Sequence, residues 1–207
     1  VTRIGELESF LGKPDDDDFV EMAQLLGARM VVGSSRAWDS YIERILEGGV
    51  FSRGNHFMTR AAQEIRARHA WREANGGWEN DKDVKECRGG LRDLELLMLI
   101  WKVHDRARDS IGDSFWERLA ERHPERRGAF TELHEASDFL NRLRDVYRLT
   151  IAPVNRLHED ELDRAAQVMG YSSRVNRSGA GRLWDEFLAH RRRVAEHVDE
   201  MLDHFNL

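Results

Sequence analysis

The sequence predicts an all-α fold, built as one multi-helix, bundle-like domain over residues 1–207. Three observations support this prediction. Apolar residues recur at helical spacing along most of the chain, only three prolines interrupt it, and no segment shows the apolar–polar alternation of a half-buried strand. The composition, 41% hydrophobic and 34% charged, is that of a globular protein, and a single domain of this size buries roughly 70% of the surface that its unfolded chain exposes.

The first third of the chain is expected to form four helices. A short amphipathic helix over residues 2–11 precedes a run of four aspartates at residues 15–18, which opens a second helix because acids in a first turn complement the helix dipole. A Ser-Ser pair at residues 34–35 caps a third helix, which a Gly-Gly pair at 48–49 ends. The fourth helix, over residues 53–74, has a face that is half basic.

The rest of the chain is predicted to be one long irregular stretch followed by further helices. Residues 75–90 form the irregular stretch, and residues 91–108 form a strongly apolar helix that should lie at the centre of the core. The later helices are expected at about residues 113–122, 125–149, 159–169 and 182–205. The sequence RSGAGR at residues 177–182 is interpreted as a flexible linker in preference to an anion-binding turn.

Charge and cysteine content exclude several classes of protein. A formal net charge of −6 argues against nucleic-acid binding, which needs a basic surface. The single cysteine, Cys87, precludes an internal disulfide and suits a reducing cytoplasm. No apolar run is long enough for a membrane span, so no membrane partner is expected. The first residue is Val1, which indicates a processed chain or a piece cut from a longer protein.

A double glycine lies at the start of the apolar helix, inside the segment DVKECRGGLRDLELLMLI. Two glycines allow another backbone or a ligand to approach closely, and a helix N-terminus flanked by basic side chains favours a phosphate or a carboxylate. The alternative is a loop that ends in a helix start, with Asp93 helping to cap it; composition alone does not separate the two. The candidate binding residues are Lys85, Arg88, Gly89, Gly90, Arg92 and Asp93.

The segment VKECRGGLRDLELL resembles the Val-Lys-Glu-Gly-Pro-Gly-Gly-Leu-Arg-Asp-Leu-Gln signature of the helical domain in bacterial protein-PII uridylyltransferases of the GlnD type. A looser version occurs in glutamine synthetase adenylyltransferases. The segments LLGARMVVGSSRAWDSY, RAAQEIRARHAWRE and FLNRLRDVYRLTIAPVNRLHEDELDRAAQVMGY also resemble this family in order and spacing. The resemblance extends from about residue 1 to residue 202. Cys87 and Arg88 replace the family's Gly-Pro, and Glu95 stands where glutamine is usual.

The resemblance implies a function in a larger enzyme. It implies that an upstream nucleotidyltransferase core of the same polypeptide, with a Gly-Ser motif and an Asp-x-Asp pair that hold Mg²⁺, transfers a nucleotide from UTP or ATP to a PII-like regulatory protein. This chain has no such motifs, so we assign it no catalytic or metal-ligating residue. The chain itself would be a non-catalytic helical domain that closes the nucleotide/substrate cleft of the larger enzyme. By itself it would catalyse no reaction. Lys85, Arg88 and Arg92 would contact nucleotide phosphates or the acceptor, and Asp93 would orient Arg92 or cap the helix.

Two alternatives belong to other classes of protein. A stand-alone α-helical interaction module would keep the fold without catalysis, and the acidic net charge is compatible with it. A metal-dependent phosphohydrolase is the second alternative, because a helical His-Asp pair occurs at His104 and Asp105. It would need further ligands such as His69 and His134, so we consider it the weaker of the two.

Overall fold

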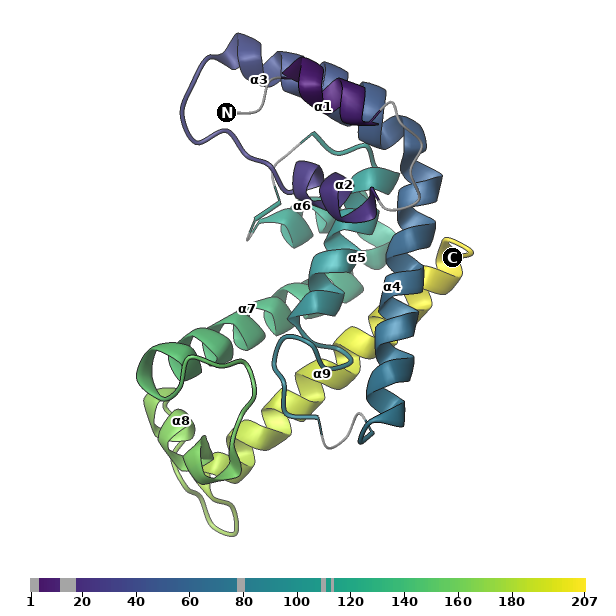
Figure 1. Cartoon of the computed structure of the whole chain (residues 1–207). Coiled ribbons are helices and arrows are strands. Elements are labelled where there is room, and N and C mark those ends of the chain that lie inside the picture. Colours follow the sequence, from purple (N-terminus) through teal and green to yellow (C-terminus); the bar gives the residue numbers. More distant parts are fainter. Residues whose placement is uncertain (1–3, 12–17, 78–80, 109–110, 113) are drawn as a thin grey trace. The chain divides into compact units, whose positions relative to one another are not determined.

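The predicted all-α fold is confirmed. In the part of the chain that the computed structural model describes, the regular elements are helices, and β-pairing is limited to isolated bridges (Figure 1). The described residues are 4–11, 18–77, 81–108, 111–112 and 114–207. The α-helices are α1 (Ile4–Leu11), α2 (Phe19–Leu26), α3 (Ser35–Tyr41), α4 (Gly54–Ala74), α5 (Leu91–His104), α6 (Phe115–Arg122), α7 (Arg127–Thr150), α8 (Leu162–Val168) and α9 (Gly179–His204). No described helix has both the length and the apolarity that crossing a membrane requires.

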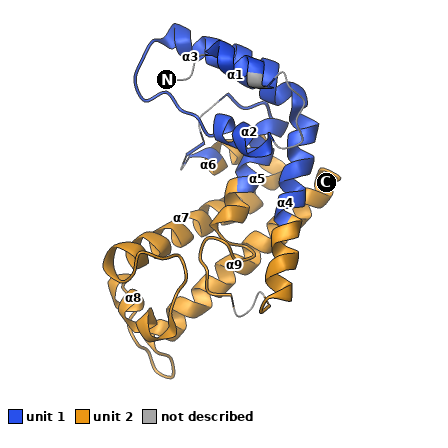
Figure 2. Ribbon diagram, in the orientation of Figure 1, with its two compact units in different colours: residues 1–65, 96–115, 207 blue, residues 66–95, 116–206 orange. Residues whose placement is uncertain are grey.

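The chain divides into two compact units, which Figure 2 colours separately. Unit 1 takes its described residues from 1–65 and 96–115, together with residue 207, whereas unit 2 takes them from 66–95 and 116–206. Helices α4 and α5 therefore contribute residues to both units. Neither unit is a continuous stretch of sequence. The prediction of one domain over residues 1–207 stays a prediction.

The core of unit 1 is apolar, with one buried ammonium group. Its most deeply buried side chains include Met22, Leu26, Ile45, Phe57 and Trp101. Lys102 is also only 1% exposed. Its Nζ donates a hydrogen bond to the carbonyl of Leu26 at 2.8 Å, so part of the cost of burying the amine is offset.

The third helix of unit 1 does not end where the sequence predicts. Helix α3 continues as a π-helix, Ile42–Val50, and a 3₁₀ turn, Phe51–Arg53, which leads directly into α4. The prediction that Gly48 and Gly49 end this helix is therefore wrong. A Cβ atom on Gly49 would lie 2.4 Å from Leu11 Cδ1, so glycine at this position permits close packing against α1.

Of the aspartate run, only Asp18 lies among the described residues. Residues 15–17 lie outside the described residues, and α2 begins at Phe19, immediately after Asp18. The side chain of Asp18 makes no capping hydrogen bond. It stands at the N-cap position of α2, is 2% exposed and forms an ion pair with Arg53, so its side chain pairs with a guanidinium and does not bond the helix amides. Its function in the fold is to compensate a partly buried guanidinium.

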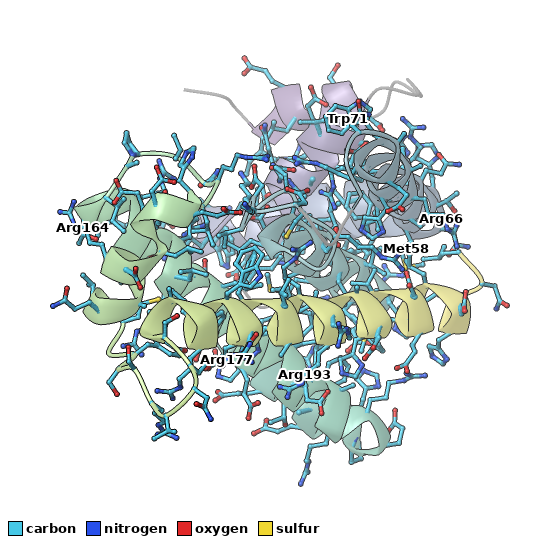
Figure 3. All side chains as sticks on the ribbon, turned by 90° about the horizontal axis from the view of Figure 1, so that it is seen from below. Met58, Arg66, Trp71, Arg164, Arg177 and Arg193 are labelled. Carbon is cyan, nitrogen blue, oxygen red and sulfur yellow. The ribbon has the colours of Figure 1, made fainter. Side chains whose placement is uncertain are left out.

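In unit 2, α9 packs against both α7 and α8. Helix α7 has an apolar stripe at helical spacing, and this stripe is the face of the helix that is buried. The buried residues of this stripe are Phe130, Leu133, Ala136, Leu140, Leu143 and Tyr147. Helix α9 runs across Figure 3, with Arg177 near its start and Arg193 further along.

The predicted linker before the last helix is the beginning of α9. The Ser178 side chain accepts a hydrogen bond from the Gly181 amide at 3.0 Å, which is an ordinary N-cap. A Cβ on Gly179 would lie 2.5 Å from the carbonyl oxygen of Tyr171. The interpretation as a flexible linker is therefore wrong, because the glycines and the serine specify a helix start packed against its neighbour.

Candidate functional site

The candidate site is the segment of residues 81–93 in unit 2, which contains the predicted binding residues. Backbone pairing holds it in place: the Val84 amide donates to the Asn155 carbonyl, and the Leu157 amide donates to the Lys82 carbonyl, both at 2.9 Å. The Asp83 carboxylate accepts from the amides of the residues two and three positions later, again at 2.9 Å. A side chain that bonds its own backbone in this way stabilises a turn, so the segment is ordered although it is not helical.

The first amides of α5 are bonded within the segment. The Leu91 amide donates to the Val84 carbonyl at 3.2 Å, and the Arg92 amide donates to the Lys85 carbonyl at 2.9 Å. An anion site at a helix N-terminus uses amides that have no such partner. The expectation that these amides face a ligand is therefore not met, and any recognition by this segment has to come from its side chains.

Asp93 locks the segment to the surrounding structure. Its carboxylate is fully buried and accepts hydrogen bonds from the Gly89 amide at 2.7 Å and from Nε2 of His69 at 2.8 Å. Arg68 forms an ion pair with the same carboxylate. A carboxylate in the first turn of a helix that accepts a hydrogen bond from a backbone amide just before the helix is a capping arrangement. The capping expected of Asp93 is thus observed, while Arg92 pairs with Glu95 at 2.9 Å.

The double glycine is required by two close approaches. Gly89 has a φ of +74°, and a Cβ there would lie 1.9 Å from the carbonyl oxygen of Arg191 in α9. A Cβ on Gly90 would lie 2.8 Å from the Lys85 carbonyl oxygen. Of the two possibilities that the sequence left open, another backbone or a ligand, the structure places a backbone against Gly89.

Arg191 is the residue that the sequence interpretation missed. Its side chain is fully buried, and Nη1 donates to the Asp81 carbonyl at 2.7 Å while Nε donates to the Arg88 carbonyl at 3.3 Å. The guanidinium also lies 5.1 Å from the ring centroid of Phe187. The sequence signal was available, because position 191 continues the apolar stripe of α9 through Phe187 and Val194. A charged residue on such a stripe is either paired or bonded to backbone carbonyls.

The three basic side chains of the candidate site remain partly accessible. Arg88 is 36% exposed and bonds Asp199 at 2.6 Å, and Arg92 is 39% exposed. Lys85 is also partly exposed. The structure therefore places the three cations on one anchored segment, with Arg88 and Arg92 paired to different acids. Their role in ligand binding stays a prediction.

Cys87, which stands where the related signature has glycine, is fully buried. Burial raises the pKa of its thiol well above the ordinary range, so the side chain is a neutral, apolar filler of the segment. Its amide donates to the Asp83 carbonyl at 3.1 Å, which adds to the turn.

The histidines considered as metal ligands have other partners. His104 Nδ1 lies 3.0 Å from Asp105 Oδ1, His69 bonds Asp93, and His134 lies 3.7 Å from Asp138. In the described part of the chain, no three His, Cys, Asp or Glu side chains gather in a way that could hold a metal ion. These residues do not fit the metal centre that the phosphohydrolase alternative requires.

The helical fold and the anchored 81–93 segment define an all-α domain with a charged loop–helix junction that contains a double glycine. The family model of GlnD PII-uridylyltransferase matches residues 56–202, which include this junction, and the chain belongs to that family. The chain is 29% identical, over 187 residues, to a bifunctional uridylyltransferase/uridylyl-removing enzyme of Vibrio parahaemolyticus. It is 29% identical to the Photobacterium profundum enzyme over 188 residues and 30% identical to that of Erythrobacter litoralis over 191 residues.

These matches cover most of this chain but a small part of each relative. They span 90% of the chain for the first two enzymes and 86% for the third, and 20% of each relative. The chain thus spans about a fifth of the length of the curated relatives that it matches. No solved structure matches it significantly.

Proposed function

We propose that this chain is a non-catalytic helical domain of a larger nucleotidyltransferase, which transfers a nucleotide monophosphate from UTP or ATP to a PII-like regulatory protein. The observation that supports this proposal most directly is the family match over residues 56–202, which includes the 81–93 segment. The upstream catalytic core of the same polypeptide, in a cytoplasmic enzyme of nitrogen regulation, would bind the nucleotide and Mg²⁺. We assign no Mg²⁺ ligand to the described residues of this chain.

In this proposal, the 81–93 segment presents Lys85, Arg88 and Arg92 to the nucleotide phosphates or to the acceptor protein. Anchoring supports the role, because Asp93 and Arg191 hold the backbone that carries these side chains. Nucleotidyl transfer depends mainly on positioning and charge stabilisation, so a rigidly held guanidinium is suited to it. Arg92 is the residue that we expect to matter most, because it belongs to the signature that the family shares.

The test is Arg92→Ala in the full-length polypeptide that carries this domain. Because charge stabilisation by an arginine contributes strongly to phosphoryl-type transfer, we expect the transfer rate from radiolabelled UTP or ATP to fall by about tenfold or more. The thermal midpoint should change little, since Arg92 is 39% exposed. Arg182→Ala, a partly exposed arginine at the start of α9, is the control and should keep the rate.

A near-wild-type transfer rate for Arg92→Ala would refute the role proposed for this arginine. The domain's place in a transferase is tested separately by reading the coding sequence upstream of Val1. A Gly-Ser motif followed by an Asp-x-Asp pair within about 150 residues, the size of an ordinary domain, supports the proposal. A start codon directly before Val1 would contradict it and leave the interaction module as the better explanation.

A further inference from the structure

Unit 1 contains a pocket of about 450 Å³, and none of its lining residues belongs to the 81–93 segment. Its lining residues lie within 51–58, where the 3₁₀ turn enters α4, and within 103–106, where α5 ends; Phe57 and Asp105 are not among them. Met58, one of the lining residues, is labelled in Figure 3. This volume lies within the range that small-molecule sites occupy in proteins. The pocket is therefore large enough for a small ligand.

The side chains that line this pocket carry basic groups. Four of them, Arg53, His56, His104 and Arg106, have nitrogen donors. Among the described residues, no aspartate or glutamate lines it. Each of these groups has an acidic partner within 4.0 Å, so the pocket offers hydrogen-bond donors and not a net positive potential.

Acidic side chains outside the lining hold the two arginines. Asp18, 2% exposed, pairs with Arg53, and Glu47 accepts from Nη2 of Arg106 at 2.7 Å. Arg53 also donates to the Leu11 carbonyl at 3.3 Å. A guanidinium has five N–H donors, so these partners leave others for a ligand. The side chain of Arg106 is 57% exposed and its guanidinium lies 5.9 Å from the Phe51 ring centroid. Both arginines are thus positioned before any ligand arrives.

The backbone at Arg106 is also unusual. Its φ is +48°, in the left-handed region that non-glycine residues rarely adopt. Such conformations cost free energy and are found preferentially at ligand-binding positions. Here the conformation follows directly after α5 and accompanies the ion pair of Arg106 with Glu47.

The amides at the start of α4 do not contribute to this pocket. The Gly54 amide donates to the Phe51 carbonyl, because α4 continues the preceding 3₁₀ turn. The Ser52 hydroxyl bonds the Gly48 carbonyl at 2.7 Å. Recognition in this pocket therefore depends on the arginine and histidine side chains, and guanidinium groups suit the planar, paired oxygens of a phosphate.

We propose that this pocket is a second anion site, which binds the phosphate group of a small phosphate-bearing molecule. The proposal does not depend on the transferase assignment, because none of the residues 85–93 lines the pocket. The phosphate could belong to a nucleotide or to a free polyphosphate, and the experiment distinguishes these sources.

The test is isothermal titration of this chain with inorganic pyrophosphate, UTP and uridine, using variants that change one charge each. Arg106→Gln removes a lining guanidinium, and we expect it to weaken pyrophosphate or UTP binding by about tenfold. Arg108→Gln is the matched control, because Arg108 bonds the same carboxylate, Glu47, at 3.0 Å, is 65% exposed and does not line the pocket. It should keep the wild-type affinity. His104→Gln is a second lining variant, and circular dichroism checks that all variants fold.

Each outcome decides the proposal. Binding of pyrophosphate and UTP with equal affinity supports a site for the phosphate group alone, and tighter binding of UTP supports a nucleotide. In both cases Arg106→Gln and His104→Gln must weaken binding more than Arg108→Gln. Equal weakening by Arg106→Gln and Arg108→Gln would indicate a general effect of net charge and overturn the proposal. Absence of binding by either phosphate compound, or binding of uridine as tight as that of UTP, would also overturn it.

Discussion

Replacing Asp93 by alanine tests the anchoring of the 81–93 segment directly. The change removes a fully buried carboxylate and leaves two basic groups behind, Arg68 with a side chain 12% exposed and His69 with one 14% exposed. It also leaves the buried Gly89 amide without its acceptor. Removing one partner of a buried ion pair typically costs 3–5 kcal/mol, so we expect the free energy of unfolding to fall by about 4 kcal/mol. For a chain of this size, that lowers the thermal midpoint by about 10 °C.

The assay is thermal and urea unfolding followed by circular dichroism, with Asp199→Ala as the control. Asp199 is also a carboxylate bonded to an arginine of the segment, Arg88, but it is 50% exposed. An exposed ion pair contributes less than about 1 kcal/mol. If Asp93→Ala and Asp199→Ala cost the same, the argument that burial makes Asp93 an anchor is refuted.

A double-mutant cycle identifies the partner of Asp93. Because Arg68 and Asp93 contact each other, the effects of Arg68→Ala and Asp93→Ala should not add, and the coupling should be about 2 kcal/mol. Additive effects would assign the anchoring to His69 and the Gly89 amide, which are the other donors to this carboxylate.

Two further predictions concern a glycine and a histidine of unit 2. Gly89→Ala should lower the free energy of unfolding by about 3 kcal/mol or more. Gly77→Ala is the control, because Gly77 has a φ of +72° but no atom lies within 4 Å of the added Cβ, and it should cost about 1 kcal/mol. Equal losses in urea unfolding would contradict the close approach of α9 to Gly89. Burial, and to a smaller extent Arg193, lowers the pKa of His190 in the folded protein. The unfolded chain therefore binds a proton at His190 more tightly, and the stability of the folded state falls as the pH drops below about 6.5. The drop in thermal midpoint between pH 7.5 and 5.5 should be smaller in His190→Gln, and an unchanged drop would show that other groups cause it.

Helical periodicity is local, and for this reason most elements were predictable. The spacing of apolar residues predicted α7 within a few residues of its observed ends, and the polar fourth helix expected over residues 53–74 is α4. It also located the 81–93 segment as an irregular stretch before an apolar helix. Three of the four segments quoted for the family resemblance lie in the matched region, residues 56–202, and the segment at residues 25–41 lies before it. These features depend on residues a few positions apart, so the sequence alone is enough to predict them.

Glycine and charged residues were harder to interpret, because their roles depend on what approaches from elsewhere. Gly48 and Gly49 looked like a helix end, but the helix continues and Gly49 accommodates Leu11. Asp18 looked like a cap and is the buried partner of Arg53. In each case the partner lies far along the chain, and no periodicity marks it.

The sequence by itself therefore determined the all-α class, the positions of the main helices and the basic, glycine-containing junction at residues 85–93. Only the tertiary structure decided what that junction does physically. It brought α9 against Gly89, buried Arg191 beneath the segment and gave Asp93 its partners on α4. The reason is that local propensity sets the backbone of each helix, whereas the burial and pairing of a charge are properties of residues that meet only after the chain has folded.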